Sequence, residues 1–106
     1  FLYAPDFAKI ICNILLDGKY KSTQPVICCM QIETTIKKMV YTLANIMNID
    51  KEILNWDTTK SDGCMKKTVD NNNLLKYYPE LKFTSLQEGL KQTYKWFCDN
   101  QKTLRQ

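Results

Sequence analysis

The chain of 106 residues contains no histidine. An imidazole is the usual base that activates a serine or cysteine nucleophile, and its absence excludes every Ser-His and Cys-His arrangement. Paired carboxylates for acid–base work do not stand out either, since Asp57 and Asp62 fall in a stretch of turn-forming residues. We therefore expect no catalytic residues in this chain.

Glycine is almost as scarce, with only Gly18, Gly63 and Gly89. None of the three belongs to a Gly-x-Gly-x-x-Gly or phosphate-loop pattern, in which closely spaced glycines let the backbone approach a phosphate. The sequence therefore predicts no cradle for a dinucleotide or a nucleoside triphosphate, and no cofactor bound by this chain.

Metal-binding motifs are missing as well. The five cysteines are Cys12, Cys28, Cys29, Cys64 and Cys98. No Cys-x-x-Cys spacing occurs, and without histidine a zinc site lacks its usual ligands. We expect Cys12, Cys28 and Cys98 to act as small buried hydrophobic residues. An odd number of unpaired thiols suits a reducing compartment, hence the cytoplasm.

Long apolar runs and charge stripes are also absent. The longest apolar run, residues 10–16, contains Asn13 and falls short of the roughly 18 residues of a membrane span. The net charge of +4 is mild, and lysines are adjacent only at 37–38 and 66–67. We therefore expect neither a membrane nor a nucleic acid as partner. Phe1 opens directly into apolar sequence, from which we expect a fragment or a processed chain.

Apolar side chains at helical spacing predict four helices. They cover residues 4–17, 33–48, 71–78 and 85–99. Pro5 suits a first helical turn and Gly18 a helix end. Ser85 with Glu88 three residues later forms a capping box. Trp56 and Trp96 have apolar neighbours, and we expect them in the core rather than on a ligand platform.

Strands are expected between these helices. Residues 25–30 lack polar alternation, as in a strand covered on both faces, and residues 53–56 form a second short apolar run. Residues 1–3 resemble the tail of a strand, and residues 81–83 an extended segment. Strand, helix and strand within about thirty residues make a βαβ unit. The sequence thus predicts one α/β domain over residues 1–106, helix-rich with a short parallel sheet.

Residues 57–68 are the candidate functional site. They follow the second expected strand, and parallel sheets bind ligands beyond the carboxyl ends of their strands. The Asp62 carboxylate can accept hydrogen bonds from ribose hydroxyls, and Lys66 and Lys67 offer charges suited to phosphate. A nucleoside diphosphate ligand fits this pattern. The other interpretation is a solvated turn whose charges lie in water.

One motif is a coincidence. Tyr78 and Lys82 have the Tyr-x-x-x-Lys spacing of short-chain dehydrogenases, in which both side chains project from one helix. Pro79 between them argues against a continuous helix.

The chain resembles the C-terminal part of the GDP-L-fucose synthase family over nearly its whole length. The resemblance rests on residues 1–8, 57–63, 66–67, 70, 84–90 and 93–97. Its most specific parts are the Lys-Ser-Asp-Gly loop and the Gly-Leu…Tyr-x-Trp-Phe helix. Cys29, Asn73 and the pair Ala4 and Pro5 depart from the family pattern, which has Gly, Arg and a Val-Asp type pair there.

The resemblance implies the smaller, substrate-binding domain of an NADP-dependent 3,5-epimerase/4-reductase in the extended short-chain dehydrogenase group. The Rossmann domain that holds NADP and the catalytic residues has no counterpart in this sequence. The resemblance also implies that Asp62 contacts the ribose end of a GDP-sugar and Lys67 its diphosphate. We expect binding without catalysis, within a parent enzyme that is a homodimer. The alternative is a ligand-free structural or self-association module derived from a nucleotide-sugar epimerase or dehydratase.

Overall fold

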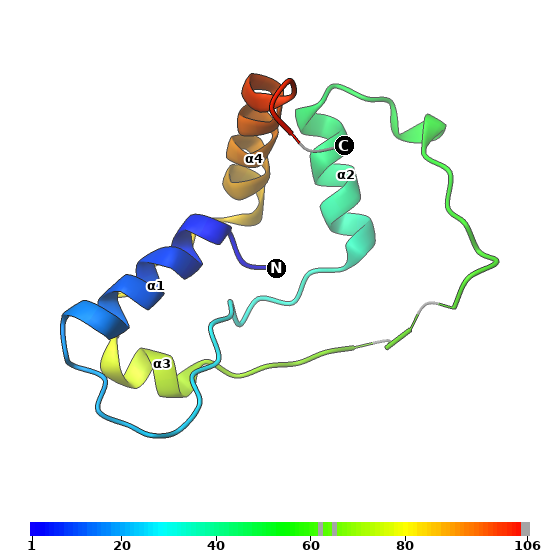
Figure 1. Cartoon of the computed structure of the whole chain (residues 1–106). Coiled ribbons are helices and arrows are strands. Elements are labelled where there is room, and N and C mark those ends of the chain that lie inside the picture. The colour runs from blue at the N-terminus through cyan, green and yellow to red at the C-terminus, as the bar shows by residue number, and fades with distance from the viewer. Residues whose placement is uncertain (62, 65, 105–106) are drawn as a thin grey trace. The chain divides into compact units, whose positions relative to one another are not determined.

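Four α-helices and one short 3₁₀ helix make up the regular structure of the described residues (Figure 1). The computed structural model describes residues 1–61, 63–64 and 66–104. The helices are α1 (Ala4–Leu16), α2 (Ile36–Ile46), η1 (Lys51–Ile53), α3 (Asn72–Tyr77) and α4 (Leu86–Asn100). All four α-helices match the segments that the apolar spacing predicts, except that α4 continues one residue further, to Asn100.

Local capping explains several of these boundaries. Pro5 lies in the first turn of α1, where its missing N–H costs nothing. The Thr35 hydroxyl accepts a hydrogen bond from the Lys38 N–H at the start of α2. The Ser85 hydroxyl accepts one from the Glu88 N–H at 3.3 Å at the start of α4. These bonds satisfy N–H groups that have no partner inside a helix.

The predicted parallel sheet is wrong, because no strand occurs in residues 1–61, 63–64 and 66–104. A strand requires a ladder of bonds to a second strand. In the segment 25–30, the Cys29 carbonyl instead accepts a bond from the Asn71 side chain at 2.7 Å. In the segment 53–56, Ile53 closes η1, with its N–H on the Asp50 carbonyl at 3.3 Å. The expected βαβ unit is therefore absent from the described residues.

The chain divides into two compact units. The first unit comprises Phe1–Glu33 and Cys64–Thr84, and the second comprises Thr34–Gly63 and Ser85–Gln106. Helices α1 and α3 belong to the first unit, and α2, η1 and α4 to the second.

The core of the first unit forms around Ile10 on α1, Leu74 on α3 and Tyr78. Partly buried side chains surround these three residues: Ile14, Tyr20, Val26, Cys28, Tyr77, Leu81 and Phe83. The Asp6 carboxylate accepts bonds from the N–H of Thr84 at 2.7 Å and from its hydroxyl at 2.9 Å. Segments from both parts of the sequence therefore close around one small core.

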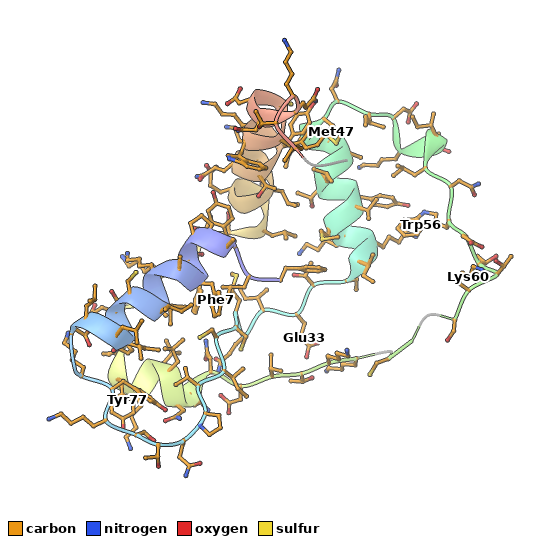
Figure 2. The ribbon with its side chains drawn as sticks, viewed as in Figure 1. Phe7, Glu33, Met47, Trp56, Lys60 and Tyr77 are labelled. Atoms are coloured by element: carbon orange, nitrogen blue, oxygen red, sulfur yellow. The ribbon has the colours of Figure 1, made fainter. Side chains whose placement is uncertain are left out.

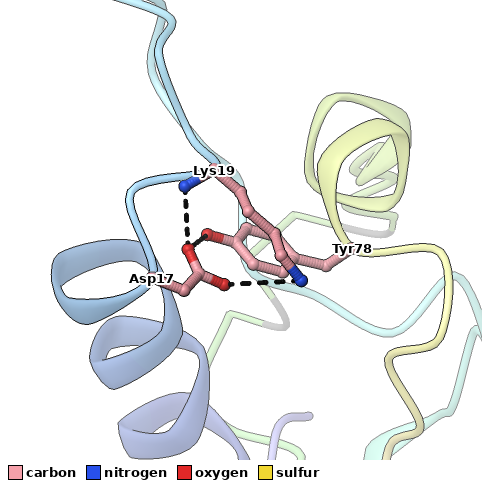
Figure 3. A network of polar contacts seen from close by, with 3 residues as sticks. All are labelled: Asp17, Lys19 and Tyr78. Atoms are coloured by element: carbon pink, nitrogen blue, oxygen red, sulfur yellow. Dashed lines mark hydrogen bonds and ion pairs between the residues drawn. The ribbon is translucent and has the colours of Figure 1, made fainter.

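A polar contact joins the end of α1 to the end of α3 in this unit. The Tyr78 hydroxyl donates a hydrogen bond of 2.9 Å to Oδ1 of Asp17, and the Lys19 N–H donates to the same oxygen at 3.0 Å (Figure 3). Burial of the ring, with the nearby Asp17 carboxylate, raises the pKa of Tyr78 above its usual value. The proton therefore stays on Tyr78 in the folded unit.

In the second unit, α2 packs against α4. The buried residues of this pair are small, namely Ala44 on α2 and Gly89 on α4. Because both residues are small, the backbones of α2 and α4 can approach each other closely. Of the described helices, including the 15 residues of α4, none is both long and apolar enough to cross a bilayer.

The cysteine and tryptophan predictions need correction. All five cysteines are free thiols, but Cys12 and Cys98 are exposed rather than buried, and Cys28 is half-buried. Trp56 and Trp96 are 43% and 55% exposed, so the expected core positions are wrong. Large apolar side chains are also exposed on α1 (Phe7, Ile11, Leu15, Leu16), on α2 (Ile36) and on α4 (Trp96, Phe97).

Candidate functional site

The candidate loop begins with a tight turn at Asp57 in the second unit. Its Oδ1 accepts hydrogen bonds from the Thr59 hydroxyl at 2.6 Å and from the Thr59 N–H at 2.9 Å. The hydroxyl bond first, and then the backbone bond, lower the pKa of the Asp57 carboxyl. Asp57 is therefore charged at neutral pH, and one of its oxygens is engaged in holding the turn.

Gly63 sustains the next turn. Its φ of +69° lies in the left-handed region, where a Cβ is unfavourable. The Ser61 hydroxyl accepts a hydrogen bond from the Gly63 N–H at 3.3 Å. The positive φ of Gly63 and its bond to Ser61 are consistent with the turn chemistry of the Ser-Asp-Gly sequence. Asp62 itself lies outside the described residues.

Lys66 forms an ion pair with Glu33 within the first unit. Its Nζ lies 3.0 Å from Oε1 of Glu33, and the Thr68 hydroxyl donates to the same oxygen at 3.3 Å. The hydrogen bond from Lys66 is the main cause that lowers the pKa of Glu33. Lys66 therefore has a described acidic partner, although both side chains stay largely exposed.

Lys67 has a different environment, although it is adjacent to Lys66. Its side chain is exposed, and no carboxylate pairs with it in the part of the chain that the structure describes. The two lysines that the sequence offers as one cationic pair are therefore not equivalent. Of the two, Lys67 is the one whose charge is available to an anion.

The joint role of Asp62 and Lys67 stays a prediction. Asp62 lies outside the described residues, and the two positions belong to different units.

A polar network that sequence reasoning missed supports the same segment. Asp70 Oδ1 accepts hydrogen bonds from the Asn72 N–H at 2.6 Å and from the Gln31 side chain at 3.2 Å. Its Oδ2 accepts from the Asn72 side chain at 2.9 Å. Asp70 thus holds the start of α3 and residue 31 together. An aspartate two residues before a helix start was the available signal.

The Tyr-x-x-x-Lys motif is a coincidence, as predicted. Helix α3 ends at Tyr77, and Tyr78 has a φ of −130° and a ψ of 64°, outside helical values. Tyr78 and Lys82 therefore share no helix face, and the Tyr78 hydroxyl is engaged with Asp17.

Comparison with known proteins places the sequence beside one group of enzymes. No family model matches the chain, and no solved structure matches it. The chain is 32% identical to the GDP-L-fucose synthase of Dictyostelium discoideum over 99% of its own length and 32% of that protein. It is 31% identical to a probable GDP-L-fucose synthase of Drosophila melanogaster, over 94% of the chain and 31% of that protein. It is 32% identical to the GDP-L-fucose synthase of Escherichia coli K12, over 99% of the chain and 34% of that protein. The chain spans about a third of the length of these relatives.

Proposed function

The chain is related to GDP-L-fucose synthases over nearly its whole length, and we propose that it is the GDP-sugar-binding part of such an enzyme. In this proposal Lys67 contacts the diphosphate of the nucleotide sugar, and Asp62 accepts hydrogen bonds from the ribose. The protein works in the cytoplasm, where its free thiols stay reduced.

The observation that carries the proposal is the difference between the two adjacent lysines. Glu33 holds Lys66 at 3.0 Å, whereas Lys67 is exposed without a described acidic partner. An ammonium group is a compact charge with three donors, and an unpaired one can bind phosphate oxygens without first breaking an ion pair. This supports Lys67, rather than Lys66, as the diphosphate contact.

The epimerisation and reduction steps belong to other residues in this proposal. This chain has no histidine and no glycine-rich cradle for a dinucleotide, so its residues do not fit NADP. NADP is held elsewhere in the parent enzyme, and the chain alone binds the GDP-sugar without turning it over.

Calorimetric titration with GDP tests the proposal. We expect weak but saturable binding, because only two side chains contact GDP in this proposal. Lys67 contacts the diphosphate, and Asp62 contacts the ribose. Lys67→Ala should weaken binding by about tenfold, as for a lost hydrogen bond to a charged group. Asp62→Ala should also weaken it.

The matched control is Lys66→Ala, which removes the neighbouring lysine and leaves Lys67 in place. We expect it to change the affinity by less than about threefold, because Lys66 is already paired. An equal loss in both lysine variants, or no binding of GDP by the unaltered chain, would contradict the assignment.

A second candidate function is self-association. Phe7, Ile11 and Leu15 recur every four residues on α1 and are 45%, 39% and 74% exposed. Residues at this spacing lie on one helix face, and an apolar face of this kind commonly contacts another polypeptide. Sedimentation of the chain, compared with that of Phe7→Gln and Leu15→Gln, tests this. A stable oligomer that binds no GDP would favour the second function over the first.

A further inference from the structure

The second unit carries an exposed group of two aromatic rings and two lysines. We call Lys37, Tyr41, Lys51 and Trp56 the aromatic–lysine cluster. Lys37 and Tyr41 are one turn apart on α2, and Lys51 begins η1. Trp56 lies on the segment after η1 (Figure 2). Three successive parts of the second unit therefore converge on one ring.

The aromatic pair is partly exposed to solvent. The Tyr41 and Trp56 rings meet edge to face, with centroids 6.3 Å apart and planes at 71°. Tyr41 is half-buried, while Trp56 is 43% exposed. This contact steadies the indole without covering it, since an edge-to-face neighbour occupies only part of a ring's surface.

Both lysines lie close to the Tyr41 ring. The Nζ of Lys37 is 5.6 Å from the ring centroid, and the Nζ of Lys51 is 5.4 Å from it. Each contact is favourable, because the face of an aromatic ring attracts a cation. Two ammonium groups from separate elements, α2 and η1, are thus held near one ring.

Nearby carboxylates do not neutralise these lysines. No ion pair involves Lys37 or Lys51 in residues 1–61, 63–64 and 66–104. The Asp50 carboxylate accepts the Glu52 N–H at 3.0 Å and so caps η1. The Asp57 carboxylate is engaged with Thr59. The cluster therefore combines two lysines that have no ion pair among the described residues with a partly exposed indole.

We propose that the aromatic–lysine cluster binds a nucleoside diphosphate, with the base stacked on Trp56 and the phosphates between Lys37 and Lys51. A flat apolar ring next to two cations suits a ligand that has a planar base at one end and negative charge at the other. This site goes beyond the GDP-sugar contact assigned to Asp62 and Lys67, because it uses none of those residues.

Tryptophan fluorescence tests the site directly. Trp96→Phe leaves Trp56 as the sole tryptophan. We expect GDP to quench it saturably, and guanosine to quench it only at higher concentrations. Lys37→Gln and Lys51→Gln should each raise the Kd for GDP by about fivefold, as for an exposed charge contact. Lys38→Gln is the matched control on α2 and should leave the Kd unchanged. Circular dichroism of each variant confirms that its helices are intact.

Four results would overturn the proposal. One is the absence of quenching by GDP. Another is pyrophosphate binding as tightly as GDP, which would indicate an anion site without base recognition. A single-stranded oligonucleotide that binds far more tightly, with steep salt dependence, would indicate nucleic acid. The last result is quenching that is abolished by Lys67→Ala but not by the Lys37 and Lys51 variants. It would show that GDP binds at the contact assigned to Asp62 and Lys67 instead. If Lys67→Ala leaves quenching intact, the cluster stands whatever the fate of the GDP-sugar assignment.

Discussion

The side-chain amide of Asn71 donates a hydrogen bond of 2.7 Å to the backbone carbonyl of Cys29. Asn71 stands at the start of α3 and is 2% exposed. The bond holds the apolar segment 25–30 to the start of α3. The sequence predicts that this segment pairs with a strand, but here it is bonded by a side chain instead. It is thus one reason why the first unit holds together without a sheet.

Asn71→Ala should destabilise the first unit by about 1–3 kcal/mol, because it leaves the Cys29 carbonyl without this donor and opens a small void. Urea unfolding measures the change. Asn55→Ala, at an exposed asparagine, is the control and should stay within about 0.5 kcal/mol of the unaltered chain. Equal stabilities for the two variants would show that the Asn71 bond contributes nothing.

Leu74→Ala should have the largest effect on the first unit. Leu74 is 0% exposed and lies in the core with Ile10, so we expect a loss of about 2–5 kcal/mol. Leu15→Ala makes the same chemical change at a side chain that is 74% exposed. It should cost less than about 1 kcal/mol in unfolding experiments. A comparable loss at Leu15 would mean that another surface covers α1.

Tyr78 should make stability depend on alkaline pH. Its pKa is raised in the folded unit, chiefly by burial and then by Asp17, from a usual value of 10.0. The unfolded chain therefore releases this proton first as pH rises. The contribution of Tyr78 is present in full below about pH 10 and is lost as pH rises through the folded pKa.

Unfolding measured between about pH 8 and pH 11 should show this loss in the unaltered chain and less of it in Tyr78→Phe. Tyr77→Phe, at the adjacent ring, keeps the Tyr78 bond to Asp17 and should behave like the unaltered chain. The same pH dependence in Tyr78→Phe would assign the effect to another group.

The pKa of Glu33 should depend on the presence of Lys66. Its pKa lies below the usual 4.5, chiefly because of the hydrogen bond from Lys66. The contribution of Glu33 to stability is therefore present above the unfolded pKa and is lost as pH falls through the folded pKa. In an NMR titration of the Glu33 carboxyl, Lys66→Gln should raise this pKa toward 4.5. High salt should act in the same direction.

Lys67→Gln provides the control for this titration. Lys67 makes no described ion pair, so its loss should move the Glu33 pKa much less than the loss of Lys66 does. Equal shifts in the two variants would show that the two lysines share Glu33, contrary to the arrangement on which the diphosphate assignment to Lys67 depends.

Helices were the part of the fold that the sequence could predict. Their hydrogen bonds join residues four apart, and their caps, such as Thr35 and Ser85, act on the next turn. The positive φ of Gly63 was predictable for the same reason, because glycine adopts this conformation without a Cβ clash. The absence of histidine likewise settled, without any structure, that no Ser-His or Cys-His chemistry resides in this chain.

Only the tertiary structure decided that the predicted strands do not form and which charged side chains are paired. A strand exists only if a distant segment supplies a ladder, and the segment 25–30 meets an asparagine side chain instead. Lys66 and Lys67 are chemically identical neighbours in the sequence, yet only the first lies 3.0 Å from Glu33, more than thirty positions earlier. The contact of Trp56 with Tyr41, and the approach of two lysines to the Tyr41 ring, likewise depend on how α2, η1 and the following segment meet. Contacts between residues far apart in the sequence decide these features, and local patterns do not encode them.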